Sequence, residues 1–147
     1  MVSRLILAVA LGAVTANSPE GPLAKLEKRE AQAEVGDISG YYTCKGQEAG
    51  GKNYSGVAVI TKKNDVYLIQ WVVGAGSTFT GIGVRQGTTF AASWAMTTEK
   101  GVMRGVNLYK VESGPRLNGR WATLPGNGQM QNETLTFLKA LEHEEEE

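Results

Sequence analysis

The side chains that most often carry catalysis are scarce in the central part of this chain. The only histidine, His143, lies near the end of the chain, and the only cysteine is Cys44. Without a histidine between Ile38 and Ala140, a Ser-His-Asp triad, a Cys-His pair and a histidine metal site are all excluded from that region. A single cysteine also excludes an intramolecular disulfide. We therefore expect no enzyme, no metal site and no cofactor.

Glu133 is the acidic residue that could do chemistry of another kind. Alternation along its segment places it on the same face as Leu135 and Phe137, which we expect to face inward. A buried carboxylate must be hydrogen-bonded or paired, because its desolvation otherwise opposes ionisation. Two interpretations are open: Glu133 is a structural partner for neighbouring groups, or it is a polar anchor for a bound ligand.

Three tryptophans allow a similar pair of interpretations. Trp71, Trp94 and Trp121 each lie on the apolar side of a segment with alternating polarity, and Tyr67 shares a face with Trp71. Large aromatic side chains on inward faces usually fill a core. They would equally suit the wall of a site for a sugar, a lipid or a heterocycle. The candidate ligand-binding residues are thus Tyr67, Trp71, Trp94, Trp121 and Glu133.

The elements that must position these residues repeat along the chain. Tyr54-Ser55-Gly56-Val57, Phe79-Thr80-Gly81-Ile82 and Met103-Arg104-Gly105-Val106 share one pattern, and each is followed by a turn signal and then a tryptophan. The pattern predicts a strand, a tight turn and a second strand, three times over. The shared glycines suit bends or close strand approach.

Period-two alternation and β-branched residues extend this prediction to an all-β domain. We expect eight strands, at residues 40–46, 54–61, 65–73, 78–85, 88–95, 102–111, 116–123 and 129–138. Because the connections are short, neighbouring strands should pair in sequence order as antiparallel hairpins. Such a chain can close into an eight-stranded antiparallel up-and-down barrel, which we favour, or form a β-sandwich.

The chain divides into four parts. Residues 1–16 have a basic residue, a ten-residue apolar run and a small-residue site, which predicts a signal peptide. Residues 17–37 form a polar linker, flexible or helical, in which Lys28-Arg29 resembles a dibasic processing site. Residues 38–140 form the β domain, and residues 141–147 form an acidic tail. We therefore expect a secreted or periplasmic cell-envelope protein without a transmembrane span.

The formal net charge of zero conceals an uneven distribution of charge. The domain from Ile38 to Ala140 has 11 lysines and arginines against 5 acids, a net charge of +6. This permits contact with an extracellular macromolecule that is anionic. Aromatic and basic residues do not interleave as in a known nucleic-acid module, so we expect no nucleic-acid partner.

Strand and turn residues of the domain resemble a family of small exported bacterial all-β proteins of unsettled function, whose members are sometimes labelled fibronectin-binding. The matching segments are Gly40-Tyr41-Tyr42, Tyr54-Ser55-Gly56, Asp65-Val66-Tyr67 with Trp71, Phe79 to Gly83, Val106 to Tyr109, Leu117 to Trp121 and Gly126 to Leu135. The strand order also resembles lipocalin-like and avidin-like barrels. The resemblance implies the fold and carries no binding residue over.

Two main classes of function follow from these observations, and an enzyme of unusual kind, which two close carboxylates in an open cleft would favour, is a minor third. The first is a non-enzymatic binding module that holds a small apolar or sugar-like ligand in the barrel, or a macromolecule on its surface. The second is a structural or adhesion-type envelope protein with a filled core. A wide barrel with converging polar side chains would favour the first, whereas a core closed by the three tryptophans would favour the second.

Overall fold

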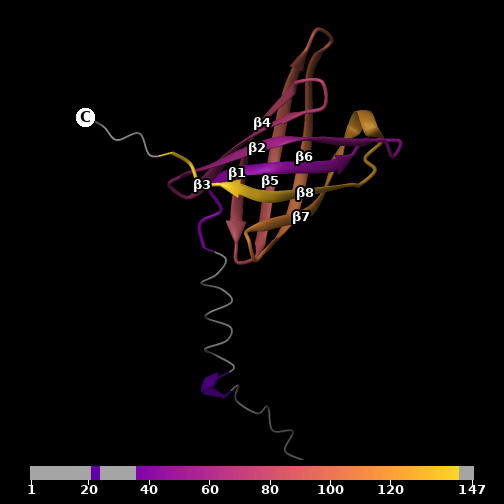
Figure 1. The fold of residues 1–147 in the computed structure, drawn as a ribbon. Helices are drawn as coiled ribbons and strands as arrows, with labels where there is room; N and C mark the ends of the chain where they lie inside the picture. Colours follow the sequence, from indigo (N-terminus) through magenta and orange to yellow (C-terminus); the bar gives the residue numbers. More distant parts are fainter. Residues whose placement is uncertain (1–20, 24–35, 143–147) are drawn as a thin grey trace, which may run out of the picture.

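The computed structural model describes residues 21–23 and 36–142, and the latter range contains a closed antiparallel barrel (Figure 1). Its strands follow the chain in order, each paired with its neighbours, and β8 pairs with β1 to close the ring. They are β1 (Gly40–Gln47), β2 (Asn53–Lys63), β3 (Val66–Val73), β4 (Ser77–Gln86), β5 (Thr89–Thr98), β6 (Gly101–Glu112), β7 (Arg116–Thr123) and β8 (Gln131–Lys139). The eight-stranded up-and-down barrel is therefore confirmed, and the sandwich is excluded.

Most strand boundaries lie close to the predicted ones. β5 ends three residues later than predicted, and β2 ends and β8 begins two residues later than predicted. β5 continues to Thr98, because it reaches a two-residue turn before β6. β8 begins at Gln131 rather than at residue 129. The preceding residues form a short 3-10 helix, η1 (Leu124–Gly126), followed by Gly128 with φ of +66°, a conformation outside the strand region.

Two-residue turns fix the register of three hairpins. They lie at residues 64–65, 87–88 and 99–100, where Lys63 faces Val66, Gln86 faces Thr89 and Thr98 faces Gly101. A tight turn holds the two strands in one alignment, and alternation then decides which side chains point inward. Two of these turns, at residues 64–65 and 87–88, coincide with turn signals found in the sequence. The third turn signal in the sequence, Ser113-Gly114-Pro115, forms the connection between β6 and β7.

Inward glycines lie beneath aromatic rings of neighbouring strands. Gly105 faces Trp94 directly, and a methyl group added at Gly105 would collide with the Trp94 indole. Gly46 and Tyr54 are related in the same way. Glycine permits the sharp curvature of a small barrel, and the ring covers the backbone that glycine leaves bare. The predicted role of the repeated glycines in close approach is confirmed.

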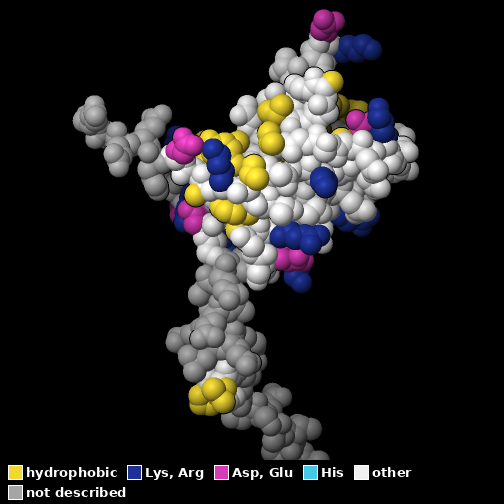
Figure 2. Space-filling model, in the orientation of Figure 1, with side chains coloured by type: hydrophobic (Ala, Val, Ile, Leu, Met, Phe, Trp, Pro, Cys, Tyr) yellow, Lys and Arg dark blue, Asp and Glu magenta, His cyan; other side chains and the backbone are white. Residues whose placement is uncertain are grey.

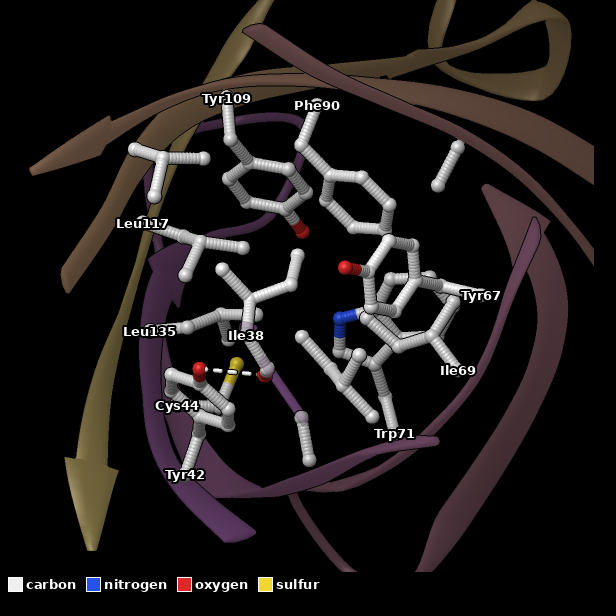
Figure 3. Close-up of a cluster of buried hydrophobic side chains, with 14 of the residues drawn as sticks. Ile38, Tyr42, Cys44, Tyr67, Ile69, Trp71, Phe90, Tyr109, Leu117 and Leu135 are labelled. Atoms are coloured by element: carbon white, nitrogen blue, oxygen red, sulfur yellow. Dashed lines mark hydrogen bonds between the residues drawn. The ribbon is translucent and has the colours of Figure 1, made fainter. Parts of the chain in front are cut away.

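One end of the barrel is sealed by Ile38, which lies two residues before the start of β1. Ile38 is 0% exposed and lies among the inward side chains of this end (Figure 3). The Tyr42 hydroxyl donates a hydrogen bond of 2.6 Å to the Ile38 carbonyl, and the Arg85 guanidinium donates one to the Gly36 carbonyl. Buried around Ile38 are Ile60, Tyr67, Phe90, Tyr109, Val111, Leu117 and Leu135. We call this the plugged end and the opposite one the mouth.

The predicted signal peptide, most of the predicted linker and residues 143–147 lie outside the described residues. Within the described ranges, no helix has both the length and the apolar character needed to cross a bilayer.

Candidate functional site

The carboxylate of Glu133 lies inside the barrel and collects hydrogen bonds from three strands. Glu133 is 5% exposed and points inward from β8, as predicted. Its Oε2 accepts a hydrogen bond of 2.5 Å from the Tyr54 hydroxyl of β2. Its Oε1 accepts one of 3.1 Å from Nε1 of Trp71 on β3. Long-range pairing of the strands thus brings together side chains that lie far apart in the sequence.

Two residues of β6 complete this arrangement. The Tyr109 hydroxyl donates to Oε1 of Glu133, and Nδ2 of Asn107 donates to the same oxygen at 3.3 Å. Nδ2 of Asn107 also donates to the Tyr109 hydroxyl at 2.6 Å. The four donors to Glu133 are all neutral side chains, so hydrogen bonding supports the buried charge without a direct ion pair.

Burial and the carboxylate of Glu133 keep the hydroxyls of Tyr54 and Tyr109 and the thiol of Cys44 protonated. Burial raises the pKa of Tyr109 well above its usual value, and the nearby charge of Glu133 adds to the effect. The pKa values of Tyr54 and of the Cys44 thiol are raised for the same two reasons, burial first. The hydroxyls therefore remain hydrogen-bond donors, and the Cys44 thiol is not a nucleophile at neutral pH.

Two buried polar atoms beside the Glu133 cluster have no hydrogen-bond partner within residues 36–142. They are Oδ1 of Asn107 and Nε1 of Trp121. The Trp121 indole N–H lies close enough to the Tyr54 hydroxyl to lower the pKa of Tyr54, against the larger effects of burial and Glu133. A carboxylate only accepts hydrogen bonds, so Asn107 must turn its Nδ2 toward Glu133, and its Oδ1 must face away. Asn107 and Trp121 are direct partners in the pairing of β6 with β7. An acceptor and a donor are thus left open on neighbouring strands, at a cost of about 1–3 kcal/mol each if nothing satisfies them.

Aromatic side chains lie in a continuous row across the mouth. Phe79 contacts Trp94 with ring centroids 4.9 Å apart, Trp94 contacts Trp121 at 6.2 Å, and Trp121 contacts Tyr54 at 6.4 Å. All three contacts are edge-to-face. Phe79, Trp121 and Tyr54 are only partly buried. At the plugged end Tyr42, Phe90 and Tyr109 are at most 1% exposed, and Phe137, packed on Tyr42, is partly buried. We call these four residues the aromatic row.

The candidate residues from the sequence fall into two groups. Trp71 bonds Glu133 directly, and Trp94 and Trp121 join the cluster through the aromatic row and Tyr54. Tyr67 lies apart, packed edge-to-face on Phe90 at 5.7 Å in the core of the plugged end. The structure therefore gathers four of the five candidates around the mouth half of the barrel.

Sequence reasoning missed Tyr54, Asn107 and Tyr109. Alternation carried a usable signal for each of them. Asn107 and Tyr109 are two residues apart on β6, in phase with Val111, and Tyr54 is in phase with Ala58 and Ile60 on β2. An asparagine in phase with inward apolar residues marks a buried amide, which needs a polar partner.

Comparison with known proteins identifies a related fold and no family. No protein-family model matches the chain, and no curated protein matches it. Among solved structures, the chain resembles a redesigned β-barrel, mFAP1, whose structure was determined bound to DFHBI. The TM-score is 0.52 and the identity 15%, over 72% of this chain and 97% of that chain.

The chain has the fold of a lipocalin-like barrel. At this identity the likeness concerns architecture alone. The resemblance to exported bacterial proteins stays a prediction, since no family model supports it. Export itself also stays a prediction, because the residues that predict it lie outside the described ranges.

Proposed function

We propose that the barrel binds a small, flat, largely apolar molecule at its mouth. The observation that carries this proposal is the difference between the two ends. Ile38 and a buried cluster fill one end, whereas the aromatic row at the other end keeps Tyr54, Phe79 and Trp121 partly accessible. Aromatic faces offer large contact areas to planar apolar ligands at low entropic cost.

The two buried polar atoms at the mouth, Nε1 of Trp121 and Oδ1 of Asn107, indicate which polar groups the ligand would carry. Nε1 of Trp121 would donate to a ligand acceptor, and Oδ1 of Asn107 would accept from a ligand donor. A heterocycle with an amide-like edge carries both groups side by side. Glu133 would act through Asn107, because its hydrogen bond fixes the amide with Oδ1 turned away. The ligand of mFAP1 is consistent with a barrel of this architecture holding a small molecule.

We infer that the barrel is a binding module rather than an enzyme. The one carboxylate in the site is engaged by four donors, and the thiol nearby is protonated. A structural envelope protein with a filled core is the second candidate. The deep burial of Trp71 and Trp94, at 3% and 7% exposed, favours that candidate.

A binding screen with matched variants tests the proposal. Heterocyclic amides, sugars and lipids would be titrated against the full chain, with tryptophan fluorescence and calorimetry as readouts. The Trp121→Phe variant keeps a ring but removes the N–H, so affinity for a heterocyclic amide should fall about 10-fold, the value of one hydrogen bond.

Tyr67→Phe is the control, because Tyr67 lies in the core of the plugged end and should leave affinity unchanged. Thermal unfolding of both variants would show that the fold is intact. No binding below roughly 1 mM by any compound class would contradict the proposal and favour the filled-core alternative.

A further inference from the structure

Glu133 places a negative charge inside the mouth half of the barrel. It is 5% exposed, and its four hydrogen-bond donors are neutral side chains. On the described strands, two basic residues are in phase with inward side chains. Lys62 faces Tyr67 and Arg85 faces Phe90, so both lie at the plugged end. Among the described residues, no opposite charge therefore balances Glu133 in the mouth half.

Acidic residues on the surface have basic neighbours. Glu112 faces Arg116 where β6 pairs with β7. Glu99 is followed directly by Lys100 in the turn between β5 and β6. On the side of the molecule shown in Figure 2, acidic and basic side chains are both exposed at the surface. Charges in water are screened over about 8–10 Å, whereas a buried charge is screened much less. The charge of Glu133 is therefore the one that a molecule inside the mouth would meet.

The charge of Glu133 acts on the groups around it. Burial is the larger reason for the raised pKa values of Tyr54, Tyr109 and Cys44, and the charge of Glu133 raises all three further. This charge thus opposes a second negative charge in its surroundings. By the same interaction with the sign reversed, it favours a positive charge there.

The aromatic row also suits a positive charge. The face of an aromatic ring carries negative partial charge, so it attracts a cation that lies within about 6 Å of the ring centre. Neighbouring rings of the row have centroids 4.9–6.4 Å apart, so a bicyclic molecule is large enough to contact two of them. Tyr54 connects the row to the charge, because its hydroxyl donates to Oε2 of Glu133 at 2.5 Å.

A third observation concerns the free acceptor of Asn107. Its Oδ1 is buried without a hydrogen-bond partner among the described residues, and the whole side chain is 5% exposed. A carbonyl oxygen can only accept, so it requires an N–H or O–H group from elsewhere. Positively charged nitrogen heterocycles that carry an amino group supply such a donor, and charge strengthens the hydrogen bond.

We propose that the mouth binds flat organic cations in preference to neutral or anionic molecules of the same shape, with an N–H group of the ligand donating to Oδ1 of Asn107. This inference rests on the proposed function and adds the charge of the ligand to it. A delocalised cation is more weakly hydrated than a compact ammonium, so less is lost when it leaves water. Two unit charges about 8 Å apart, at an effective dielectric constant of about 20, attract with an energy worth roughly 30-fold in affinity.

Three compounds of one shape test the preference in calorimetric titrations of the full chain at about 0.15 M salt. They are 4-amino-1-methylquinolinium, 4-methyl-1-naphthylamine and 4-amino-1-naphthoate, which share a bicyclic ring and an amino group. The first is a cation, the second is neutral and the third is an anion. We expect the cation to bind at least about 10-fold more tightly than the neutral compound, and the anion to bind least tightly.

Glu133→Gln tests the source of the preference. It should lower the affinity for the cation at least about 10-fold more than the affinity for the neutral compound, because only the cation interacts with the lost charge. Glu48→Gln is the matched control, since Glu48 is exposed in the loop that follows β1 at the mouth. This variant should leave both affinities unchanged. Thermal unfolding would show that Glu133→Gln is folded, and the three compounds test the unmodified chain independently of it.

The outcomes separate this inference from the proposed function. If the neutral compound or the anion binds as tightly as the cation, the cation preference is wrong while the mouth remains a binding site. Equal losses for the cation and the neutral compound in Glu133→Gln would also overturn it, because the effect would then come from the orientation of Asn107. If none of the three binds below roughly 1 mM, both the preference and the binding site at the mouth are contradicted.

Discussion

The carboxylate of Glu133 shows how a charge can be kept inside a small barrel. Removing a carboxylate from water is costly, and the cost is reduced here by the hydroxyls of Tyr54 and Tyr109, the indole N–H of Trp71 and the amide of Asn107. Because Oε1 accepts from three of these donors, it fixes three side chains at once. Glu133 is thus the residue around which the mouth half of the core is organised.

Replacing Glu133 by glutamine tests this role. Glutamine keeps the size but offers one acceptor oxygen and adds an N–H group, so at least one of the four donors loses its acceptor. We expect the free energy of unfolding to fall by about 1–3 kcal/mol. Urea unfolding measures this. Glu48→Gln, at an exposed loop position, should have no measurable effect, and an equal effect of both variants would contradict the organising role.

The same variant separates the two interpretations of Glu133 in a ligand titration. If stability falls and the affinity for every bound compound is unchanged, Glu133 is only a structural partner. If the affinity falls as well, Glu133 contributes to binding indirectly, because its hydrogen bond orients Asn107.

At the scale of elements, hairpins formed by neighbouring strands account for most of what the sequence could predict. Alternation and the turn residues between Tyr54 and Trp121 act over a few positions, so strands and inward faces could be inferred locally. The partners of Glu133 could not be inferred in this way. Tyr54 and Glu133 are 79 residues apart, and they meet only because β1 pairs with both β2 and β8.

The aromatic row was beyond prediction for the same reason. Its residues come from β2, β4, β5 and β7, and the contact of Trp121 with Tyr54 crosses the closed ring. A sandwich would have used the same alternating residues and brought different rings together. The choice between the two depends on β1–β8 closure, a long-range pairing that local patterns do not encode.

Glycines within strands provide a test at this scale. Gly119 lies beside Tyr109, and a methyl group there would collide with the Leu108 carbonyl and the Tyr109 ring. Because the carbonyl belongs to the backbone, the strand itself would have to move. We expect Gly119→Ala to lower the unfolding free energy by about 1–3 kcal/mol in urea.

Gly126→Ala, in η1, is the control for this prediction. Its added methyl group would meet only the side chains of Ala49 at 3.3 Å and Thr123 at 3.5 Å. Its cost should be below about 1 kcal/mol. Equal losses for the two variants would show that close strand approach is not what requires glycine at position 119.

At the scale of the whole molecule, the buried tyrosines and the buried Cys44 make the free energy of unfolding fall at alkaline pH. Burial raises the pKa of Tyr42, Tyr54 and Tyr109 in the folded barrel, whereas in the unfolded chain these tyrosines ionise near about pH 10. Above that pH the folded state holds more protons than the unfolded one, so stability falls as pH rises. The pKa of the Cys44 thiol is also raised, so Cys44 adds to this loss of stability from about pH 8.5.

Urea unfolding between pH 7 and 11.5 should therefore show nearly constant stability up to about pH 8.5 and an increasing loss above about pH 10. The slope should approach about 1.4 kcal/mol per pH unit for each buried tyrosine. Phenolate absorbance at 295 nm should rise for these residues only as the barrel unfolds. Ionisation of all tyrosines near pH 10 in the folded protein would contradict this account.

The position of the plugged end also determines which way the mouth faces when the protein is attached through one of its termini. β1 begins and β8 ends there, with Tyr41 opposite Lys139, so both termini of the domain leave the ring on the same side. A tether through either terminus therefore attaches behind Ile38 and leaves the mouth pointing outward. The same geometry makes terminal fusion or immobilisation compatible with free access to the aromatic row, while an attachment within the loop at residues 48–52 would obstruct it.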